Sequence, residues 1–167
     1  TYDIIIIGSG ISGLVLSYYL PKSVNTLILC KEEPNECNTF YAQGGVALSR
    51  DAEDIELHIK DTVEAGCDIG NIDAIRYLCE NSKARIDELI DDGLVFDKNK
   101  KGELAYTKEG AHTISRIIHC DGDATGMVMH SFFLKKLKHN LRKNSTVVDL
   151  LIKDSVCYGV SVWDGEK

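Results

Sequence analysis

Six residues near the start of the chain have the spacing of a nucleotide-binding motif. The run Gly8-Ser9-Gly10-Ile11-Ser12-Gly13 follows the pattern GxGxxG. In this pattern the first glycine permits a tight turn, the second lets the backbone approach a pyrophosphate, and the third lets a helix pack closely on a strand. The N–H groups and the positive dipole at the start of the following helix would bind the phosphates. The residues therefore predict dinucleotide binding.

The elements needed to position this motif are predicted on both sides of it. Residues 2–7 form a run that is apolar apart from Asp3, which is typical of a strand buried on both faces of a parallel sheet. After Gly10, apolar residues recur at helical spacing up to Leu20, and Pro21 is a stop signal. A second apolar run at residues 26–30 completes a unit of the size of a βαβ crossover. This context disfavours the alternative of a merely glycine-rich turn.

The residue expected to bind the ribose is missing. The motif calls for a carboxylate about twenty residues further on, at the end of the second strand. Cys30 stands at that place, and Lys31, Glu32 and Glu33 follow it. Because a lysine there could favour a 2′-phosphate, the motif alone leaves NADP open as the cofactor.

Two further blocks resemble one family of flavoproteins. Residues 38–45, Asn-Thr-Phe-Tyr-Ala-Gln-Gly-Gly, resemble the STFYAQGG segment of L-aspartate oxidases, which belong to the succinate dehydrogenase and fumarate reductase flavoprotein family. Residues 107–112, 116–119 and 123–126 resemble the TREGGH, RRILH and DATG stretches of the same family. The resemblance runs in order over nearly all of the chain. It implies an FAD-binding domain.

The resemblance also implies which residues meet the FAD. Lys31 is similar to a family lysine that follows the second strand. Thr39 and Gln43 offer hydrogen bonds to the polar edge of the flavin, although Gln43 could instead bond its own backbone. Gly44 and Gly45 would let the backbone come close to a flat ring. The full set of expected cofactor contacts is Gly8, Ser9, Gly10, Ile11, Ser12, Gly13, Lys31, Asn38, Thr39, Phe40, Tyr41, Ala42, Gln43, Gly44 and Gly45.

Asn38 separates this chain from part of the family. In the membrane-complex dehydrogenases and reductases, the aligned residue is the histidine that bonds covalently to the flavin. An amide cannot form that bond, so we expect FAD to be held by non-covalent contacts. The pair Phe40-Tyr41 also resembles the oxidases more than the dehydrogenases.

Glu109 and His112 are the candidates for the substrate side. In the resemblance this glutamate orients L-aspartate by accepting hydrogen bonds from its ammonium group, whereas a glutamate in a surface turn is the alternative. His112 could face the substrate or satisfy a backbone carbonyl. The family usually continues His-Ser-His-Arg-Arg, but this chain has His112-Thr113-Ile114-Ser115-Arg116. The second histidine and the first arginine of the family are replaced here by Ile114 and Ser115, so any role of these two positions is in doubt.

The composition excludes several classes of function. A formal net charge of −7 without a basic run argues against a nucleic-acid or anionic-membrane partner. The apolar run at residues 4–7 is too short for a signal core or a membrane span. The six cysteines form no CxxC pair or Cys/His cluster, so we expect free thiols, no metal and a cytoplasmic location. His58, His130 and His139 are expected to be solvated or packed.

The rest of the chain predicts further helices and strands. Asp51 is expected to cap a helix that ends near Gly66, and Asn71 a second helix that ends at Gly93, with a break between Cys79 and Ile86 left open. A strand around residues 115–120 and a helix from Asp123 to Leu141 should follow. Two strand-like runs, 147–152 and 158–163, precede the turn signal Asp164-Gly165, after which a partner strand would be expected.

Together these features predict an α/β fold, a Rossmann-like FAD-binding domain with a central parallel sheet, flanking helices and a small incomplete β element at the C-terminal end. Residues 1–167 would be its N-terminal portion, with a capping domain and C-terminal parts beyond Lys167. The resemblance implies oxidation of L-aspartate to iminoaspartate by hydride transfer to flavin, with O2 or fumarate as the oxidant. It implies the first step of bacterial quinolinate and NAD synthesis, with quinolinate synthase downstream, and we expect these residues alone to be inactive. Two alternatives remain open, a fumarate or succinate flavoprotein and a non-catalytic dinucleotide-binding module.

Overall fold

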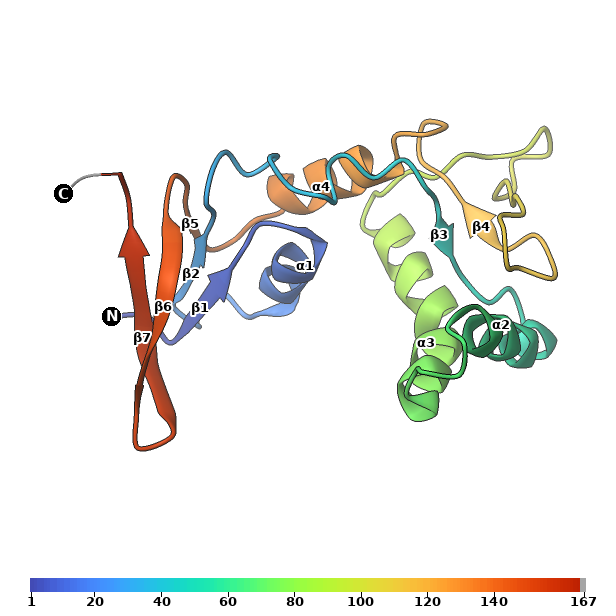
Figure 1. The fold of residues 1–167 in the computed structure, drawn as a ribbon. Coiled ribbons are helices and arrows are strands. Elements are labelled where there is room, and N and C mark those ends of the chain that lie inside the picture. Colours follow the sequence, from blue (N-terminus) through green and yellow to red (C-terminus); the bar gives the residue numbers. More distant parts are fainter. Residues whose placement is uncertain (166–167) are drawn as a thin grey trace. The chain divides into compact units, whose positions relative to one another are not determined.

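The chain forms two compact units in a computed structural model that describes residues 1–165 (Figure 1). Unit 1 consists of Thr1–Ala42 and Gly126–Lys167, and unit 2 consists of Gln43–Thr125. Unit 2 is thus an insertion, in sequence, between the two segments of unit 1.

Unit 1 contains a three-stranded parallel sheet in the order β1-β2-β5. The strands are β1 (Ile4–Ile7), β2 (Thr26–Leu29) and β5 (Asn140–Arg142), and α1 (Ile11–Tyr19) connects β1 to β2. All four residues of β2 are buried, as expected for the central strand of a sheet covered on both faces. The predicted βαβ unit and parallel sheet are confirmed.

The helix predicted from Asp123 to Leu141 is shorter than expected. α4 spans Thr125–Lys135, and the residues that follow it enter the sheet as β5. Leu141 pairs with Ile28, so the helical spacing of the leucines misled the prediction. The hydrogen bonds offered by the open edge of β2 outweigh local helix propensity, as tertiary context commonly does.

The last two strands of unit 1 pair with each other. β6 (Thr146–Lys153) and β7 (Val156–Trp163) form an antiparallel hairpin, drawn in orange and red in Figure 1. The turn residues Asp154 and Ser155 have φ of 50° and 62°, which is the left-handed backbone that a two-residue hairpin turn requires. The two predicted strands are confirmed. Their turn lies at Asp154–Ser155, ahead of the signal at Asp164-Gly165.

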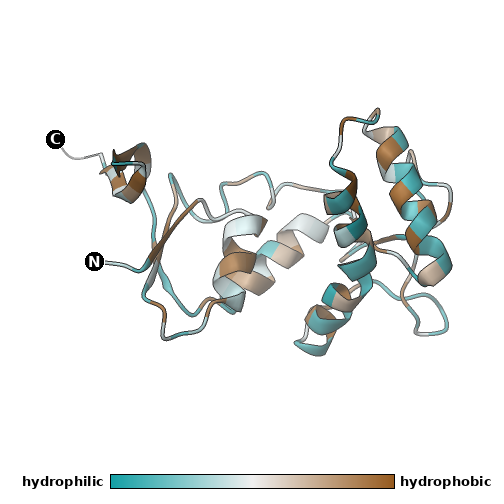
Figure 2. Cartoon of the chain, turned by 90° about the horizontal axis from the view of Figure 1, so that it is seen from below, coloured by the Kyte–Doolittle hydropathy of each residue, from teal (hydrophilic) through white to brown (hydrophobic). Residues whose placement is uncertain are grey.

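Unit 2 packs two helices beside a short antiparallel pair of strands. α2 (Ala52–Ala65) and α3 (Ile72–Asp91) begin at the predicted caps, where Asp51 accepts from the Asp54 amide at 2.9 Å and Asn71 from the Ala74 amide at 3.0 Å. α3 is continuous, so it has no break after Cys79. Apolar and polar residues alternate in stripes along both helices (Figure 2). β3 (Val46–Ala47), which was not predicted, pairs with β4 (Ile117–Ile118).

The cysteines are all free thiols, as predicted. Within residues 1–165, no helix combines the length and the apolar character needed to cross a membrane. Over the same residues, no group of three or more histidine, cysteine, aspartate or glutamate side chains is arranged to hold a metal ion.

Candidate functional site

The three motif glycines have different structural roles in unit 1. Gly8 follows β1 with φ of +101° and donates its amide hydrogen bond to the Leu29 carbonyl at 2.8 Å. A Cβ at Gly13 would collide with the carbonyl oxygen of Gly8, so the fold itself requires glycine there. At Gly10 a Cβ would have only the Thr39 Oγ1 within 4 Å, at 3.5 Å. Gly10 therefore leaves open space at the start of α1.

The first turn of α1 is suited to bind an anion. Its first helical hydrogen bond runs from the Leu14 amide to the Gly10 carbonyl at 3.1 Å, so the amides of Ser12 and Gly13 precede the intrahelical series. The turn carries no acidic residue. Free amides, the positive end of the helix dipole and the space at Gly10 together fit a pyrophosphate.

Thr39 connects the segment 38–42 to this turn. Its hydroxyl oxygen accepts a hydrogen bond from the Ile11 amide at 3.0 Å, a contact that the sequence did not predict. The hydroxyl hydrogen can still be donated elsewhere. The two blocks that the sequence linked only by resemblance are therefore in contact within unit 1.

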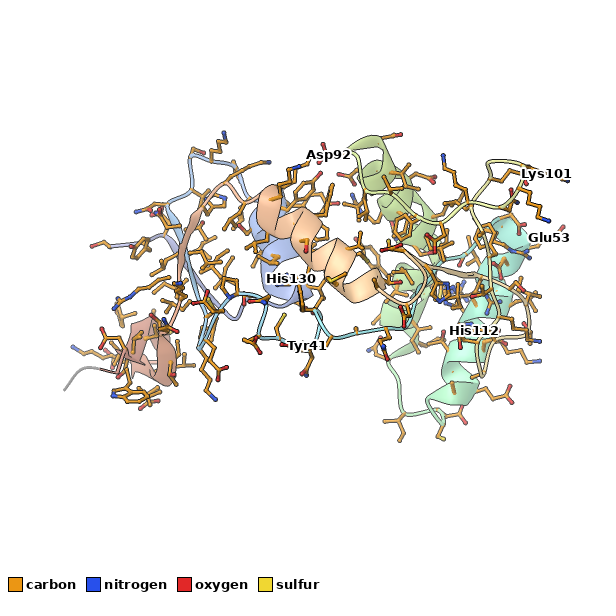
Figure 3. The ribbon with its side chains drawn as sticks, turned by 90° about the horizontal axis from the view of Figure 1, so that it is seen from above. Tyr41, Glu53, Asp92, Lys101, His112 and His130 are labelled. Carbon is orange, nitrogen blue, oxygen red and sulfur yellow. The ribbon has the colours of Figure 1, made fainter. Side chains whose placement is uncertain are left out.

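His130 fixes the motif from the side of α4. Its ring is fully buried, its Nε2 lies 3.0 Å from the Ser9 carbonyl oxygen, and it packs edge-on against Phe40 with ring centroids 5.7 Å apart (Figure 3). Because a carbonyl oxygen can only accept, Nε2 carries the hydrogen. Ser9 in turn donates from its hydroxyl to the Pro34 carbonyl at 2.9 Å. His130 is a packed histidine, one of the two alternatives expected.

Gly126, at the start of α4, packs against the backbone of the segment 38–42. Its amide donates to the Ala42 carbonyl at 3.0 Å, and a Cβ there would collide with the Thr39 carbonyl oxygen. Lys31, Asn38, Tyr41 and Ala42 are exposed, and the Tyr41 hydroxyl donates to Glu36 at 2.8 Å.

The remaining cofactor candidates, Gln43 to Gly45, belong to unit 2. The Gln43 amide donates to Asp123 at 3.5 Å, in place of the bond to its own backbone that was the alternative. A Cβ at Gly45 would lie 2.5 Å from the Ile118 carbonyl oxygen and 2.8 Å from the His119 Nε2, whereas nothing lies within 4 Å at Gly44. Gly45 is therefore required for packing on β4, and Gly44 leaves its surface open.

Glu109 lies near a histidine that the sequence did not single out. Its carboxylate is 59% exposed, and its Oε1 lies 3.9 Å from the Nε2 of His119. His119 also contacts the Thr107 hydroxyl through Nδ1 at 3.4 Å and lies against Gly45. Unit 2 thus brings Glu109 and Gly45 to the same histidine. His119 could have been noticed because it ends the block at residues 116–119.

A buried cluster of charges lies beneath the turn that carries Glu109. Arg116 is fully buried, donates to Asp54 from Nη2 at 2.7 Å and from Nε at 3.1 Å, and donates to Asp61 from Nη1. Burial, the largest single effect, would raise the pKa of both carboxyl groups. The hydrogen bonds and charge of Arg116, together with backbone hydrogen bonds from Arg50 to Asp54 and from Thr113 to Asp61, outweigh it and hold both pKa values below the usual value. The Arg116 Nη1 also lies 2.9 Å from the His112 Nδ1. The sequence assigned no role to either aspartate.

The fold and the motif define a class of protein. A parallel sheet, a glycine-rich turn after its first strand and a helix that begins at that turn are the parts of a Rossmann-like dinucleotide-binding domain. The profile of the family described as FAD binding domain matches residues 3–167, and the chain belongs to that family. Its cofactor is therefore FAD, and NADP is no longer an open alternative.

Relatives with curated names are L-aspartate oxidases. The chain is 36% identical to that of Bacillus subtilis over 98% of this chain and 31% of the relative, and 40% identical to that of Clostridium perfringens over 88% and 33%. The chloroplastic L-aspartate oxidase of Arabidopsis thaliana is 34% identical, over 95% of this chain and 26% of the relative. The chain thus spans about a third of the length of the curated relatives it matches.

Solved structures share the fold at lower identity. E. coli quinol fumarate reductase superposes with a TM-score of 0.89 at 22% identity, covering 98% of this chain and 29% of that one. Mycobacterium smegmatis Sdh1 gives a TM-score of 0.85 at 22% identity, covering 97% and 30%. A 3-ketosteroid dehydrogenase from Rhodococcus jostii gives 0.78 at 16%, covering 99% and 42%. These likenesses concern the fold.

Proposed function

We propose that the protein containing this chain is an FAD-dependent L-aspartate oxidase that converts L-aspartate to iminoaspartate. The observation that carries the proposal is the likeness to L-aspartate oxidases over nearly the whole chain, at 34–40% identity. That likeness covers the segments 38–45 and 107–112, of which Gly45 and Glu109 lie next to His119 in unit 2. The product would enter bacterial NAD synthesis in the cytoplasm, with quinolinate synthase as the next enzyme.

The residues of unit 1 would hold the phosphates of FAD. The amides of Ser12 and Gly13 would donate to the pyrophosphate, and Gly10 would let it approach the backbone. Lys31, exposed just after β2, would supply a cation near the cofactor. Bound FAD supplies the acceptor for the hydride that leaves the substrate Cα, and O2 or fumarate takes the electrons afterwards.

The residues of unit 2 would serve the flavin ring and the substrate. At Gly44 nothing lies within 4 Å of where a Cβ would be, so a flat ring could approach the backbone there. Gln43 would offer its amide to the polar edge of the ring. Glu109, which keeps more than half of its surface exposed, would accept hydrogen bonds from the substrate ammonium group. These groups orient the Cα–N bond, and the flavin carries the redox chemistry.

The first test is the activity of the full-length protein. We expect purified protein to carry FAD and to form iminoaspartate from L-aspartate with O2 or fumarate as the oxidant. A protein that holds FAD tightly but does not turn over would instead support a non-catalytic binding module. Succinate oxidation without aspartate oxidation would support the fumarate and succinate branch.

The mode of flavin attachment separates the oxidase from that branch. Asn38 is exposed, and its side-chain amide cannot form a covalent bond to the flavin. Acid precipitation of the full-length protein should therefore release all of its flavin. Absorbance of the supernatant and in-gel fluorescence of the pellet measure the two fractions. Flavin that stays with the denatured polypeptide would contradict the non-covalent assignment.

Replacement of Glu109 tests the substrate assignment. Glu109→Ala removes one charge-assisted hydrogen bond of about 1.5 to 3 kcal/mol, so kcat/KM for L-aspartate should fall by about ten- to a hundred-and-fifty-fold. If the contact is equally strong in ground and transition states, the loss appears in KM. Glu103→Ala is the matched control, because Glu103 is an exposed glutamate bonded to Asn99. If Glu109→Ala keeps the wild-type kcat/KM, Glu109 is a surface-turn residue without a role in substrate binding.

A further inference from the structure

The buried cluster around Arg116 has a feature that structural ion pairing does not require. The guanidinium group already has two carboxylate partners, Asp54 and Asp61, which are 1% and 4% exposed. A buried arginine with two such partners is fixed in position, because any displacement would leave a buried charge unpaired. Even so, its Nη1 also lies 2.9 Å from the Nδ1 of His112.

This contact determines which nitrogen of His112 carries the hydrogen. A guanidinium group has five N–H donors and no acceptor, so Nδ1 must accept the hydrogen bond. The neutral ring then has its hydrogen on Nε2. Because the two ring nitrogens point in widely different directions, Nε2–H is directed away from the Arg116 side of the ring.

The turn that carries His112 is itself held in place. Thr113, the next residue, donates to Asp61 from its amide at 2.8 Å and from its hydroxyl at 3.0 Å. Ala111 has the left-handed backbone, with φ of 65°, and the His112 amide lies 3.4 Å from the Glu109 carbonyl. Asp61 therefore fixes the guanidinium group and the turn together, so His112 has a defined position relative to Glu109.

The half-buried ring of His112 opens into a cavity of unit 2. The cavity has a volume of about 480 Å³, which exceeds the needs of a four-carbon dicarboxylate, and Figure 3 shows His112 at the side of α2. Lys108 contributes a cation to it. Its charged lining also includes Glu64 and the already paired Asp61. His112 and Lys108 both line the cavity, and an N–H donor and a lysine cation are groups that bind a carboxylate.

We propose that Arg116, held by Asp54 and Asp61, is a positioning residue that fixes His112 as the Nε2–H tautomer, and that His112 donates this hydrogen bond to a carboxylate of the dicarboxylate substrate. This inference rests on the proposed function and adds a role to it. Glu109 would recognise the ammonium group, and His112 a carboxylate group.

Succinate separates these two roles, because it has the carboxylates of aspartate without the ammonium group. Calorimetric titration of the full-length, FAD-loaded protein should give a succinate Kd that rises about ten- to a hundredfold in His112→Phe, which has a ring but no donor. His112→Gln should lose less, because its amide can donate from near the position of Nε2. Glu109→Ala should not raise the succinate Kd, because succinate has no ammonium group for Glu109 to bind. His139→Gln, at a half-buried histidine of unit 1, is the matched control.

The tautomer gives a readout that a purely structural role of Arg116 would not change. In protein labelled with ¹⁵N-histidine, the ring signals that disappear in His112→Phe should show the Nε2–H tautomer in the wild type. In Arg116→Lys they should show a mixture of tautomers, with a higher succinate Kd. If Arg116→Lys does not fold, the wild-type spectrum still shows the tautomer of His112, and the His112 variants still show whether its side chain binds succinate.

Two outcomes would overturn the proposal. One is a succinate Kd in His112→Phe within about twofold of the wild type, or no succinate binding by the wild type. The other is a wild-type His112 that has its hydrogen on Nδ1 or is doubly protonated at neutral pH. Failure of the proposed function would look different, because succinate binding and the tautomer would be as expected while L-aspartate is not oxidised.

Discussion

Individual glycines in the motif are needed for different reasons, which the pattern GxGxxG alone cannot separate. Gly13 is required by the apoprotein, because its Cα lies against the Gly8 carbonyl. Gly10 has room for a methyl group at the start of α1. The open position is the one at which a pyrophosphate would approach.

We therefore expect two alanine variants to behave differently. Gly10→Ala should destabilise the apoprotein by only about 1 kcal/mol or less, the scale of a changed helix cap, yet weaken FAD binding strongly. Gly10→Val should abolish FAD binding. Gly13→Ala should destabilise the apoprotein itself by about 1–3 kcal/mol, because a backbone carbonyl must shift. Urea unfolding of the apoprotein and flavin content measure the two effects. Full FAD content in folded Gly10→Val would refute the motif assignment.

Helix α2 contains buried charged residues that its sequence periodicity does not reveal. Its apolar positions repeat at helical spacing and predict one buried face, but of these positions only Ile59 is buried, beside the polar residues Asp54, His58 and Asp61. Asp54 and Asp61 lie on the same buried side, where Arg116 from the segment before β4 neutralises them. Because their partner is more than fifty residues away in sequence, periodicity could not distinguish them from solvated charges.

The cluster makes the stability of the protein sensitive to acid. The pKa values of Asp54 and Asp61 are lower in the folded than in the unfolded state, so their contribution is complete above the unfolded pKa of about 3.9. It is lost as the pH falls through the lower, folded values. Asp61→Asn should be less stable at pH 7 by about 3–5 kcal/mol, since Arg116 loses a partner. Its unfolding free energy should also change less between pH 5 and pH 2 than that of the wild type. Parallel pH profiles for the two proteins in urea unfolding would contradict this.

On the scale of the whole molecule, we expect the chain to supply only part of what the proposed reaction needs. It spans about a third of its curated relatives. Glu109 and His112 are the substrate-side groups that we propose, and His119 lies 3.9 Å from Glu109, whereas catalysis needs groups that reach the reacting centre from several sides. Residues 1–167 alone should therefore produce no iminoaspartate with added FAD, measured against the full-length protein. Turnover above the rate of free FAD would show that these residues contain a complete site.

The sequence alone determined the βαβ unit, the two helix caps of unit 2 and the FAD-binding family. These depend on local spacing or short motifs, for which propensity and turn chemistry suffice. The tertiary structure decided that residues 140–142 form a strand, that Thr39 bonds the start of α1 and that His119 lies between Gly45 and Glu109. It also decided that Arg116 is buried beside His112. Each of these depends on a partner distant in sequence, and hydrogen bonds and burial between such partners leave no periodic signal in the chain.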